Sequence, residues 1–442
     1  MITTNLLVQV LIIVLGPFQF GLHMSELNAP LPYMSCSESS ADCIKGIGDG
    51  AAASSAYAIG GLVGSFVAGS LADKYGRKSV LVGCSTLFLA GSTLAALATY
   101  NMALVNGRII SGLAAGASIV VGPIFISEIV PPESRGLLGS GTQAAVNLGI
   151  VVIQVAGVVW AQDNWRKILY MGPIFAVLQY LALLYAVESP KWHISTGNQA
   201  RARQDAAWLG QNYDVVRHAE EEEELQQQTH NAVSFRQYLV EPRFRQSLVV
   251  AVSIMCIQQY SGINSIVFYG VSIIRKVLPQ DAELFNLGLM TANLVVTLLS
   301  GTLIGVWGTK KLLLASLVGM LLGTAGVGLA LNAGLASVVG WSAILLFTIC
   351  SFAIGLGPIP FLLIGEYTPS EALGIAQSCG TTFNWITTFL VGALFPKLFA
   401  SMAGSVFYLF SVACLCGIFM LSVLLRPHSR SDTLQGVRVA LA

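Results

Sequence analysis

Long apolar stretches alternate with short polar segments along the whole chain. Each stretch has about 20 residues, the length that a helix needs to cross roughly 30 Å of hydrocarbon. The pattern predicts a polytopic, all-α membrane protein. We expect about twelve transmembrane helices, near residues 5–24, 50–72, 79–100, 103–129, 137–160, 167–187, 247–274, 284–306, 311–332, 339–365, 373–397 and 403–425.

One long polar segment divides the predicted helices into two groups of six. We therefore expect four parts: a six-helix bundle at 1–187, a connector with short helices at 188–246, a second bundle at 247–425 and a short tail at 426–442. The first apolar stretch contains no small-residue cleavage site, so we interpret it as a retained helix. Most basic residues lie on the side of the connector, and the positive-inside rule then places both termini, the connector and the tail in the cytosol.

Composition supports a membrane location and disfavours several functions. Only 10% of the residues are charged, against about 25% in soluble domains, so most of the chain does not face water. The sequence contains no phosphate loop, paired-histidine metal site or nucleophile elbow. We therefore expect no enzyme activity, no cofactor, no metal and, because basic tracts are missing too, no nucleic-acid partner.

The eight cysteines fall into two groups. Six lie in apolar stretches, where cysteine usually packs as a small hydrophobic residue. The other two, Cys36 and Cys43, lie in a polar loop between the first two helices. They could form a disulfide if this loop faces the exterior or an oxidising lumen.

Two turns in the first half of the chain recur in the second half. GSLADKYGRK at 69–78 recurs as GTLIGVWGTK at 301–310, and EIVPPESRG at 128–136 recurs as EYTPSEALG at 366–374. The glycines keep their offsets, but charged residues are lost in the second copies, where Gly305, Thr309 and Leu373 replace Asp73, Arg77 and Arg135. Two six-helix halves related as parallel repeats are typical of major facilitator transporters, whose substrate site lies near the bilayer midplane.

The predicted seventh and tenth helices carry residues that are unusual in lipid. Gln258, Gln259 and Asn264 are costly there unless they face protein or water. On one continuous helix Gln258 shares a face with Tyr269, and this surface offers amide donors and acceptors to sugar hydroxyls. The alternative is that these amides only bridge helices. In GLGPIP, at 355–360, the prolines break the backbone ladder, which is tolerated where backbone lines a cavity.

The motifs resemble those of the sugar porter family of the major facilitator superfamily, which includes facilitative glucose transporters and fungal hexose transporters. GSLADKYGRK, PPESRG, ESPKW at 188–192, QQYSGINSIVFY at 258–269 and GLGPIPF at 355–361 match the family's motifs in family order. HMSELNAP, at 23–30, further resembles a fungal subgroup associated with the vacuolar membrane.

The resemblance implies a set of sugar contacts. Carried over by position, these are Gln154, Gln258, Gln259, Asn264, Asn293 and Asn384, with the aromatic residues Phe361 and Trp385 nearby. Ala353 stands where glucose transporters have a glutamate. Because this hydrogen-bond acceptor is lost, we expect a hexose as the substrate but do not infer that the hexose is glucose.

His23 aligns with the aspartate that proton-coupled members of the family carry in their first helix. Histidine titrates near physiological pH and could therefore carry a coupled proton. The alternative is a neutral hydrogen-bonding residue, as in uniporters, and we favour this alternative.

The family's cytosolic turns form a latch of salt bridges that closes the inner face. By resemblance, the latch residues here are Asp73, Arg77, Glu128, Arg135, Glu188 and Glu366. Because the second half has Gly305, Thr309 and Leu373 where charges would stand, we expect a weaker latch and a resting preference for the inward-open state. Hydrophobic contacts that replace the missing pairs are the alternative.

The sequence as a whole predicts a monomeric transporter of a monosaccharide, most simply a hexose, that works by alternating access in the plasma or vacuolar membrane. Uniport is favoured over proton symport. A nutrient sensor that keeps the same fold but does not transport is the alternative.

Overall fold

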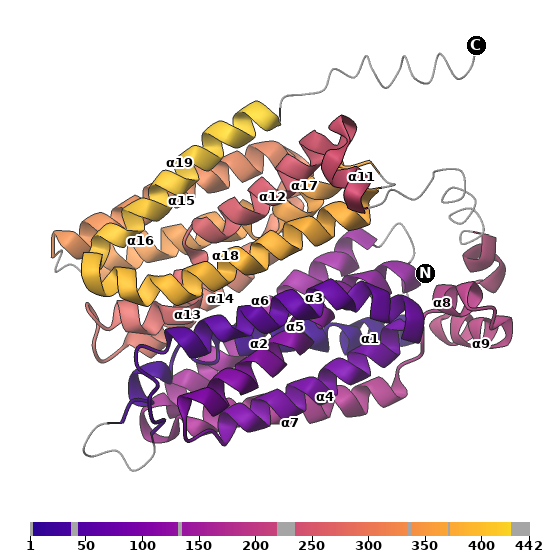
Figure 1. The fold of residues 1–442 in the computed structure, drawn as a ribbon, viewed down its shortest axis with the longest axis horizontal. Coiled ribbons are helices and arrows are strands. Elements are labelled where there is room, and N and C mark those ends of the chain that lie inside the picture. The colour runs from indigo at the N-terminus through magenta and orange to yellow at the C-terminus, as the bar shows by residue number, and fades with distance from the viewer. Residues whose placement is uncertain are drawn as a thin grey trace.

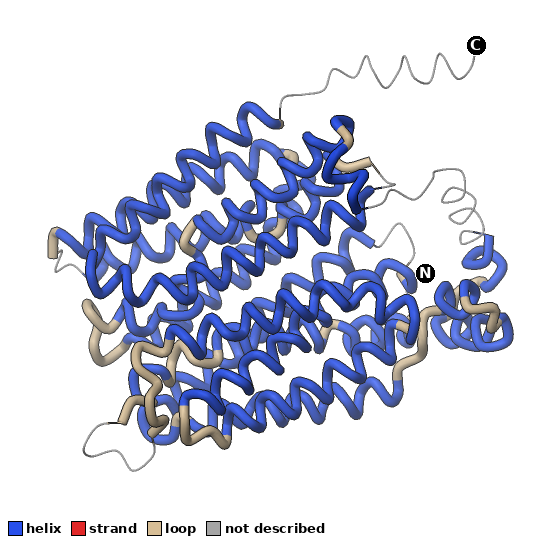
Figure 2. Tube along the Cα trace, viewed as in Figure 1, coloured by secondary structure: helices blue, strands red, loops and turns tan. Residues whose placement is uncertain are grey.

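The computed structural model is built of helices (Figure 2). It describes residues 3–36, 43–130, 135–218, 235–334, 338–369 and 372–425, with the side chains of 135–140 and 338–339 left out of the description. The expected tail at 426–442 and part of the expected connector lie outside the described residues.

The first half of the chain forms one bundle. Its helices are α1 (Thr4–Ile13), α2 (Leu15–Ser25), α3 (Ala51–Tyr75), α4 (Arg77–Ala96), α5 (Asn101–Ile129), α6 (Arg135–Asn164) and α7 (Arg166–Tyr185), with the short helix η1 (Leu31–Tyr33) after α2. The apolar stretch near 5–24 thus contains two successive helices, α1 and α2.

The second half repeats this arrangement after a set of short connector helices. The connector contains α8 (Pro190–Ser195), α9 (Gln199–Leu209), α11 (Phe235–Val240) and η3 (Pro242–Phe244). The second bundle contains α12 (Arg245–Tyr260), α13 (Ile263–Ile274), α14 (Ala282–Trp307), α15 (Thr309–Asn332), α16 (Val338–Ser351), η4 (Phe352–Leu356), α17 (Ile359–Tyr367), α18 (Leu373–Met402), η6 (Ala403–Ser405) and α19 (Val406–Leu424).

The helices are long and apolar enough to cross a membrane. Eleven stretches of the described residues meet this criterion, and one of them, Leu373–Leu424, is 52 residues long and contains both α18 and α19. The prediction of an all-α membrane protein with twelve transmembrane helices in two halves is confirmed.

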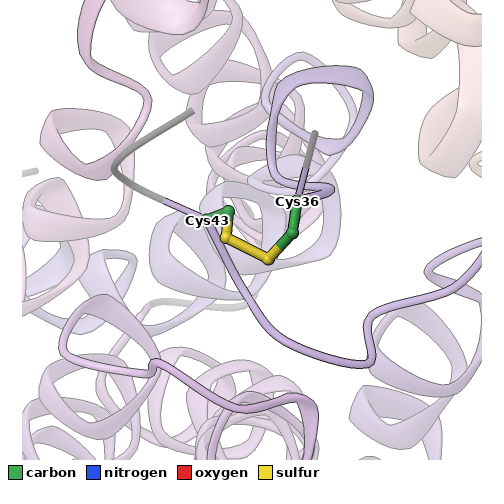
Figure 3. The surroundings of a disulfide bond; sticks show 2 residues. All are labelled: Cys36 and Cys43. Atoms are coloured by element: carbon green, nitrogen blue, oxygen red, sulfur yellow. A yellow bond between two sulfur atoms is a disulfide. The ribbon is translucent and has the colours of Figure 1, made fainter. Parts of the chain in front are cut away.

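The two halves lie side by side, the first in indigo to magenta and the second in orange to yellow (Figure 1). Helix α18 packs along α3, and α14 packs along α6. By the repeated turns, α14 is the counterpart of α3 and α18 is the counterpart of α6, so the same two helices of each half form the contact. We name the two ends of the molecule by their contents. The connector end carries α8, α9 and α11, and the disulfide end carries the loop between α2 and α3, in which Cys36 and Cys43 are joined by a disulfide (Figure 3).

Several hydrogen bonds join the two halves, some toward the disulfide end and others nearer the middle of the helices. Asn28, just after α2, donates to the Val267 carbonyl at 2.8 Å and accepts from the Val271 N–H at 2.9 Å, so its amide bonds to two backbone groups one turn apart on α13. Nearer the middle, Asn147 of α6 donates to Thr297 of α14 at 2.9 Å.

The repeated turns have the same backbone geometry in both halves. Gly76, between α3 and α4, has φ +95° and ψ 157°, and Gly308, between α14 and α15, has φ +77° and ψ 156°. Each glycine N–H closes the preceding helix, on Ala72 O and Ile304 O respectively. Because L-residues rarely adopt this φ, the turn itself requires glycine and explains why the glycines recur without the charges.

Candidate functional site

The predicted seventh helix is interrupted at the polar signature. Helix α12 ends at Tyr260 and α13 begins at Ile263, with Gly262 between them at φ +90°. A Cβ on Gly262 would lie 2.5 Å from the Phe410 ring, so both conformation and space require glycine there. The expectation of one continuous helical face from Gln258 to Tyr269 is therefore wrong.

The interruption brings the three amides of this segment together. Gln259 Oε1 accepts a hydrogen bond from Asn264 Nδ2, which also lies 3.3 Å from Thr388 Oγ1 of α18. Gln258 Oε1 accepts from Asn384 Nδ2 at 2.8 Å and from Gln259 Nε2 at 3.4 Å. Four of the predicted sugar contacts thus form one connected network in the second half.

The same network reaches the broken tenth helix. Gln258 Nε2 donates to the Leu356 carbonyl at 2.7 Å. In a regular helix this carbonyl would accept from residue 360, but Pro360 has no N–H. Gln258 therefore satisfies an acceptor that the proline leaves open. The backbone here takes a π-helical turn at η4, which contains the buried Ala353, before α17 begins at Ile359.

Gln154 and Asn293 lie in opposite halves, and each has a buried carbonyl oxygen without a partner. Gln154 of α6 is 1% exposed, and its Nε2 donates to Ser25 Oγ at 2.5 Å. Ser25 Oγ donates in turn to the Val267 carbonyl at 3.2 Å, one helical turn beyond Asn264. Neither Gln154 Oε1 nor Asn293 Oδ1 has a hydrogen-bond partner among the described residues. Buried polar atoms of this kind indicate a missing ligand or water.

The two predicted aromatic contacts have different surroundings. Trp385 points into the first half: its Nε1 donates to Ser65 Oγ at 2.7 Å, and a Cβ on Gly61 would meet its ring at 2.4 Å. Its neighbour Asn384 bonds to Gln258 in the second half, so these two consecutive residues contact both halves. Phe361 of α17 is 44% exposed.

A buried charge cluster surrounds His23. Its Nδ1 lies 2.6 Å from Glu26 Oε2, and Arg108 Nη1 donates to Glu26 Oε1 at 2.5 Å. All three side chains are at most 1% exposed, and Arg108 also lies over the Tyr57 ring, 4.5 Å from its centroid. Charged groups at this depth in a membrane protein are expensive and are usually retained for a function.

Sequence reasoning missed Glu26 and Arg108. Arg108 lies inside the predicted span 103–129, and Glu26 lies two residues beyond the predicted span 5–24. An ionisable residue inside or beside a predicted membrane helix was the available signal. The pairing itself joins residues 82 positions apart, so it could not be derived from local spacing.

The latch residues at the connector end bond within their own halves. Arg77 lies 2.8 Å from Glu128 Oε1 and 3.2 Å from Asp73 Oδ1. In the second half, Thr309 Oγ1 donates to Glu366 Oε2 at 3.0 Å. The side chain of Arg135, another predicted latch residue, lies outside the described residues.

Glu188 holds the start of α4 in place. Its carboxylate accepts hydrogen bonds from the backbone N–H groups of Arg77 at 2.9 Å and Lys78 at 3.1 Å, a favourable position for an anion at a helix N-terminus. Burial nevertheless raises the pKa of this carboxyl above its usual value, because desolvation outweighs these bonds. The Glu188 carboxylate also fills the space beside Gly76, whereas nothing described lies within 4 Å of a Cβ on Gly308.

Comparison with known proteins supports one family. Residues 9–440 match the family model described as "Sugar (and other) transporter". A Saccharomyces cerevisiae protein named as a probable metabolite transport protein is 36% identical over 98% of this chain and 94% of its own length. The rat facilitated glucose transporter member 2 of solute carrier family 2 is 31% identical over 81% of this chain and 71% of its own length.

A solved structure agrees at the level of the fold. The xylose transporter XylE from E. coli, in a partially occluded inward-open conformation, superposes with a TM-score of 0.80 over 96% of this chain and all of that chain, at 21% identity. The family and its structural neighbours are transporters and not enzymes. This chain belongs to the sugar porter family of the major facilitator superfamily.

Proposed function

We propose that the protein transports a monosaccharide, a hexose, across the membrane by alternating access. The observation that carries this proposal is the pair of unpartnered amide oxygens on Gln154 and Asn293, one from each half. Sugar hydroxyls are donors that suit these acceptors, and the amides of the second half supply both donors and acceptors. A ligand held from both halves is bound at the contact that alternating access must rearrange.

The names of similar proteins support a sugar as the substrate class. The rat relative is a facilitated glucose transporter, and the protein with the similar fold is a xylose transporter. We propose uniport, because a substrate that binds to neutral amides requires no companion charge. By position, Gln154, Gln258, Gln259, Asn264, Asn293, Phe361, Asn384 and Trp385 are the proposed sugar contacts.

Uptake of labelled hexoses by proteoliposomes tests this function. We expect saturable, downhill uptake that unlabelled hexoses inhibit and that an imposed pH gradient leaves unchanged. Gln154→Ala and Asn293→Ala should reduce this uptake. Asn332→Ala should not, because this control asparagine is exposed at the end of α15, where its Nδ2 donates to Ser405 Oγ at 2.9 Å. Absence of uptake for every sugar tested, at equal protein level, would contradict transport, and sugar binding without uptake would indicate the sensor.

Proton symport is the second candidate, and the His23–Glu26–Arg108 cluster favours it. His23 Nε2 is buried without a hydrogen-bond partner among the described residues, and histidine is the side chain most often used to carry protons. If this cluster couples protons, sugar should accumulate against its gradient when protons are driven inward, and Glu26→Gln should abolish the accumulation. Uptake that stops at equilibrium under the same gradient excludes this candidate.

We further propose that the protein works as a monomer in the plasma or vacuolar membrane, with the connector end and both termini in the cytosol. Lys74, Lys78 and Lys311 lie at the connector end, and bases favour the cytosolic side. The disulfide lies at the other end, as expected for the exterior or an oxidising lumen. Protease protection of epitope tags placed at either end of the molecule tests this orientation.

A further inference from the structure

Three side chains join the two halves at the disulfide end. Glu283, in the first turn of α14, accepts hydrogen bonds from Arg275 Nη2 at 2.7 Å and from the Tyr33 hydroxyl at 3.1 Å. Arg275 also donates to the Tyr33 hydroxyl, and its guanidinium lies 4.2 Å from the centroid of the Tyr33 ring. We propose that Tyr33, Arg275 and Glu283 are a gate latch that stabilises the closed state of the disulfide end within the transport cycle.

The latch depends on Tyr33, because Arg275 and Glu283 belong to the same half. Their ion pair lies within the second half, and of these three side chains only Tyr33 comes from the first half. The side chains of Arg275 and Glu283 are 25% and 12% exposed, so water screens this cluster less than it screens an open surface pair. Opening the disulfide end therefore has to separate Tyr33 from both charged groups.

The disulfide loop fixes Tyr33 to the first half. The residue after it, Met34, is fully buried with Ile44 and Trp165, and the Ile44 N–H donates to the Met34 carbonyl at 2.9 Å. The Cys36–Cys43 disulfide closes the loop at the same place. Tyr33 is thus held by a loop that packs on the first bundle, and it moves with that bundle. The disulfide acts in the latch by positioning Tyr33.

The proposal rests on the proposed alternating access, but its test uses no sugar. Spin labels at Met102 and Ser401, exposed positions at the disulfide end of the first and second halves, report the distance between the halves. They are introduced as cysteines in the full chain, in lipid nanodiscs, after replacement of the free cysteines Cys84, Cys256, Cys350, Cys379, Cys414 and Cys416.

Removing the crossing contacts should open this end. Tyr33→Phe deletes only the hydroxyl, and Glu283→Gln deletes the charge while keeping the shape. Each variant should raise the fraction of molecules in which the two spin labels lie far apart by roughly threefold to tenfold, which is the effect of losing a partly exposed polar contact. Glu241→Gln is the control, because Glu241 pairs with Arg243 at 2.7 Å within the connector, at the opposite end of the molecule. The proposal is overturned if the label distances in both variants equal those of wild type, or if they shift no more than the distances in the control do.

The disulfide requires a separate experiment. The double variant Cys36→Ser, Cys43→Ser should open the same end, because Tyr33 is then held less firmly. If the loop acts by positioning Tyr33, adding Tyr33→Phe to this double variant should change the distances little further. Fully additive effects would show that the loop and the hydroxyl act independently and would overturn the positioning role. A protein that transports no sugar would still give these distance changes, so failure of the latch and failure of the proposed function are distinguishable.

Discussion

At the scale of single residues, the account rests on amides that serve both the fold and the proposed ligand. Gln258→Ala and Asn384→Ala should each weaken hexose binding by about 1–3 kcal/mol, because a buried hydroxyl loses its partner. Each also removes one side of the 2.8 Å bond between the two amides. Isothermal titration with the transported hexose measures this, with Asn332→Ala as the control. Unchanged affinity in both variants would place the sugar elsewhere.

The buried charge cluster gives a second prediction at this scale. Glu26→Gln leaves the Arg108 guanidinium, whose side chain is 1% exposed, without its carboxylate partner. The free energy of unfolding should therefore fall by about 3–5 kcal/mol. Asp73→Asn disrupts an ion pair whose carboxylate side chain is 76% exposed and should change stability by about 0–1 kcal/mol. Thermal unfolding in detergent compares the two variants. Equal melting temperatures would mean that the Arg108–Glu26 pair does not stabilise the fold.

The polar positions of the site could be chosen from sequence, but their partners could not. Gln258 and Asn264 are conspicuous because amides are rare in apolar stretches, and the family motif extends the set to Asn384. That Gln258 bonds to the Leu356 carbonyl depends on how two broken helices meet 98 residues apart. The cluster around His23 likewise depends on tertiary packing.

At the scale of elements, the apolar pattern predicted the twelve transmembrane helices because length and composition suffice for a membrane helix. It did not predict where helices break within the membrane. The interruption at Gly262 requires a positive φ that a sequence pattern does not distinguish from a glycine at a helix contact. The prolines of GLGPIP did signal a break, and the structure gives it the form of a π-helical turn.

The repeated turns provide a matched pair of variants. Gly76→Ala and Gly308→Ala both force an alanine into positive φ, which costs roughly 1–2 kcal/mol. Only at Gly76 would the new Cβ lie 2.3 Å from a Glu188 carboxylate oxygen, so this variant should also lose the carboxylate at the start of α4. We expect Gly76→Ala to lower the melting temperature clearly more than Gly308→Ala does. An equal loss of melting temperature in the two variants would mean that the Glu188 carboxylate does not stabilise the turn.

At the scale of the whole molecule, we expect a resting preference for the inward-open state, because the second half has fewer charges in its cytosolic turns than the first half. Asn28 and Tyr33 bond the halves together toward the disulfide end, while Arg77, Glu128 and Glu366 at the connector end bond within their own halves. Adding Gly305→Glu with Leu373→Arg restores charges that the second half lacks, and space is open beside Gly305. Spin labels at Tyr75 and Trp307 should then move closer together. The double variant Gly305→Ala, Leu373→Ala is the uncharged control. Equal label distances in the charged and the uncharged double variants would contradict the expected inward-open preference.

The central claim is that one sugar site between the halves is exposed to each side of the membrane in turn. Equilibrium counterflow tests it most directly: proteoliposomes loaded with unlabelled hexose are placed in a trace of labelled hexose, without any pH gradient. We predict a transient accumulation of label inside the vesicles that is lost in Gln258→Ala and retained in Asn332→Ala. Binding of the hexose to the purified protein without any counterflow would contradict alternating access.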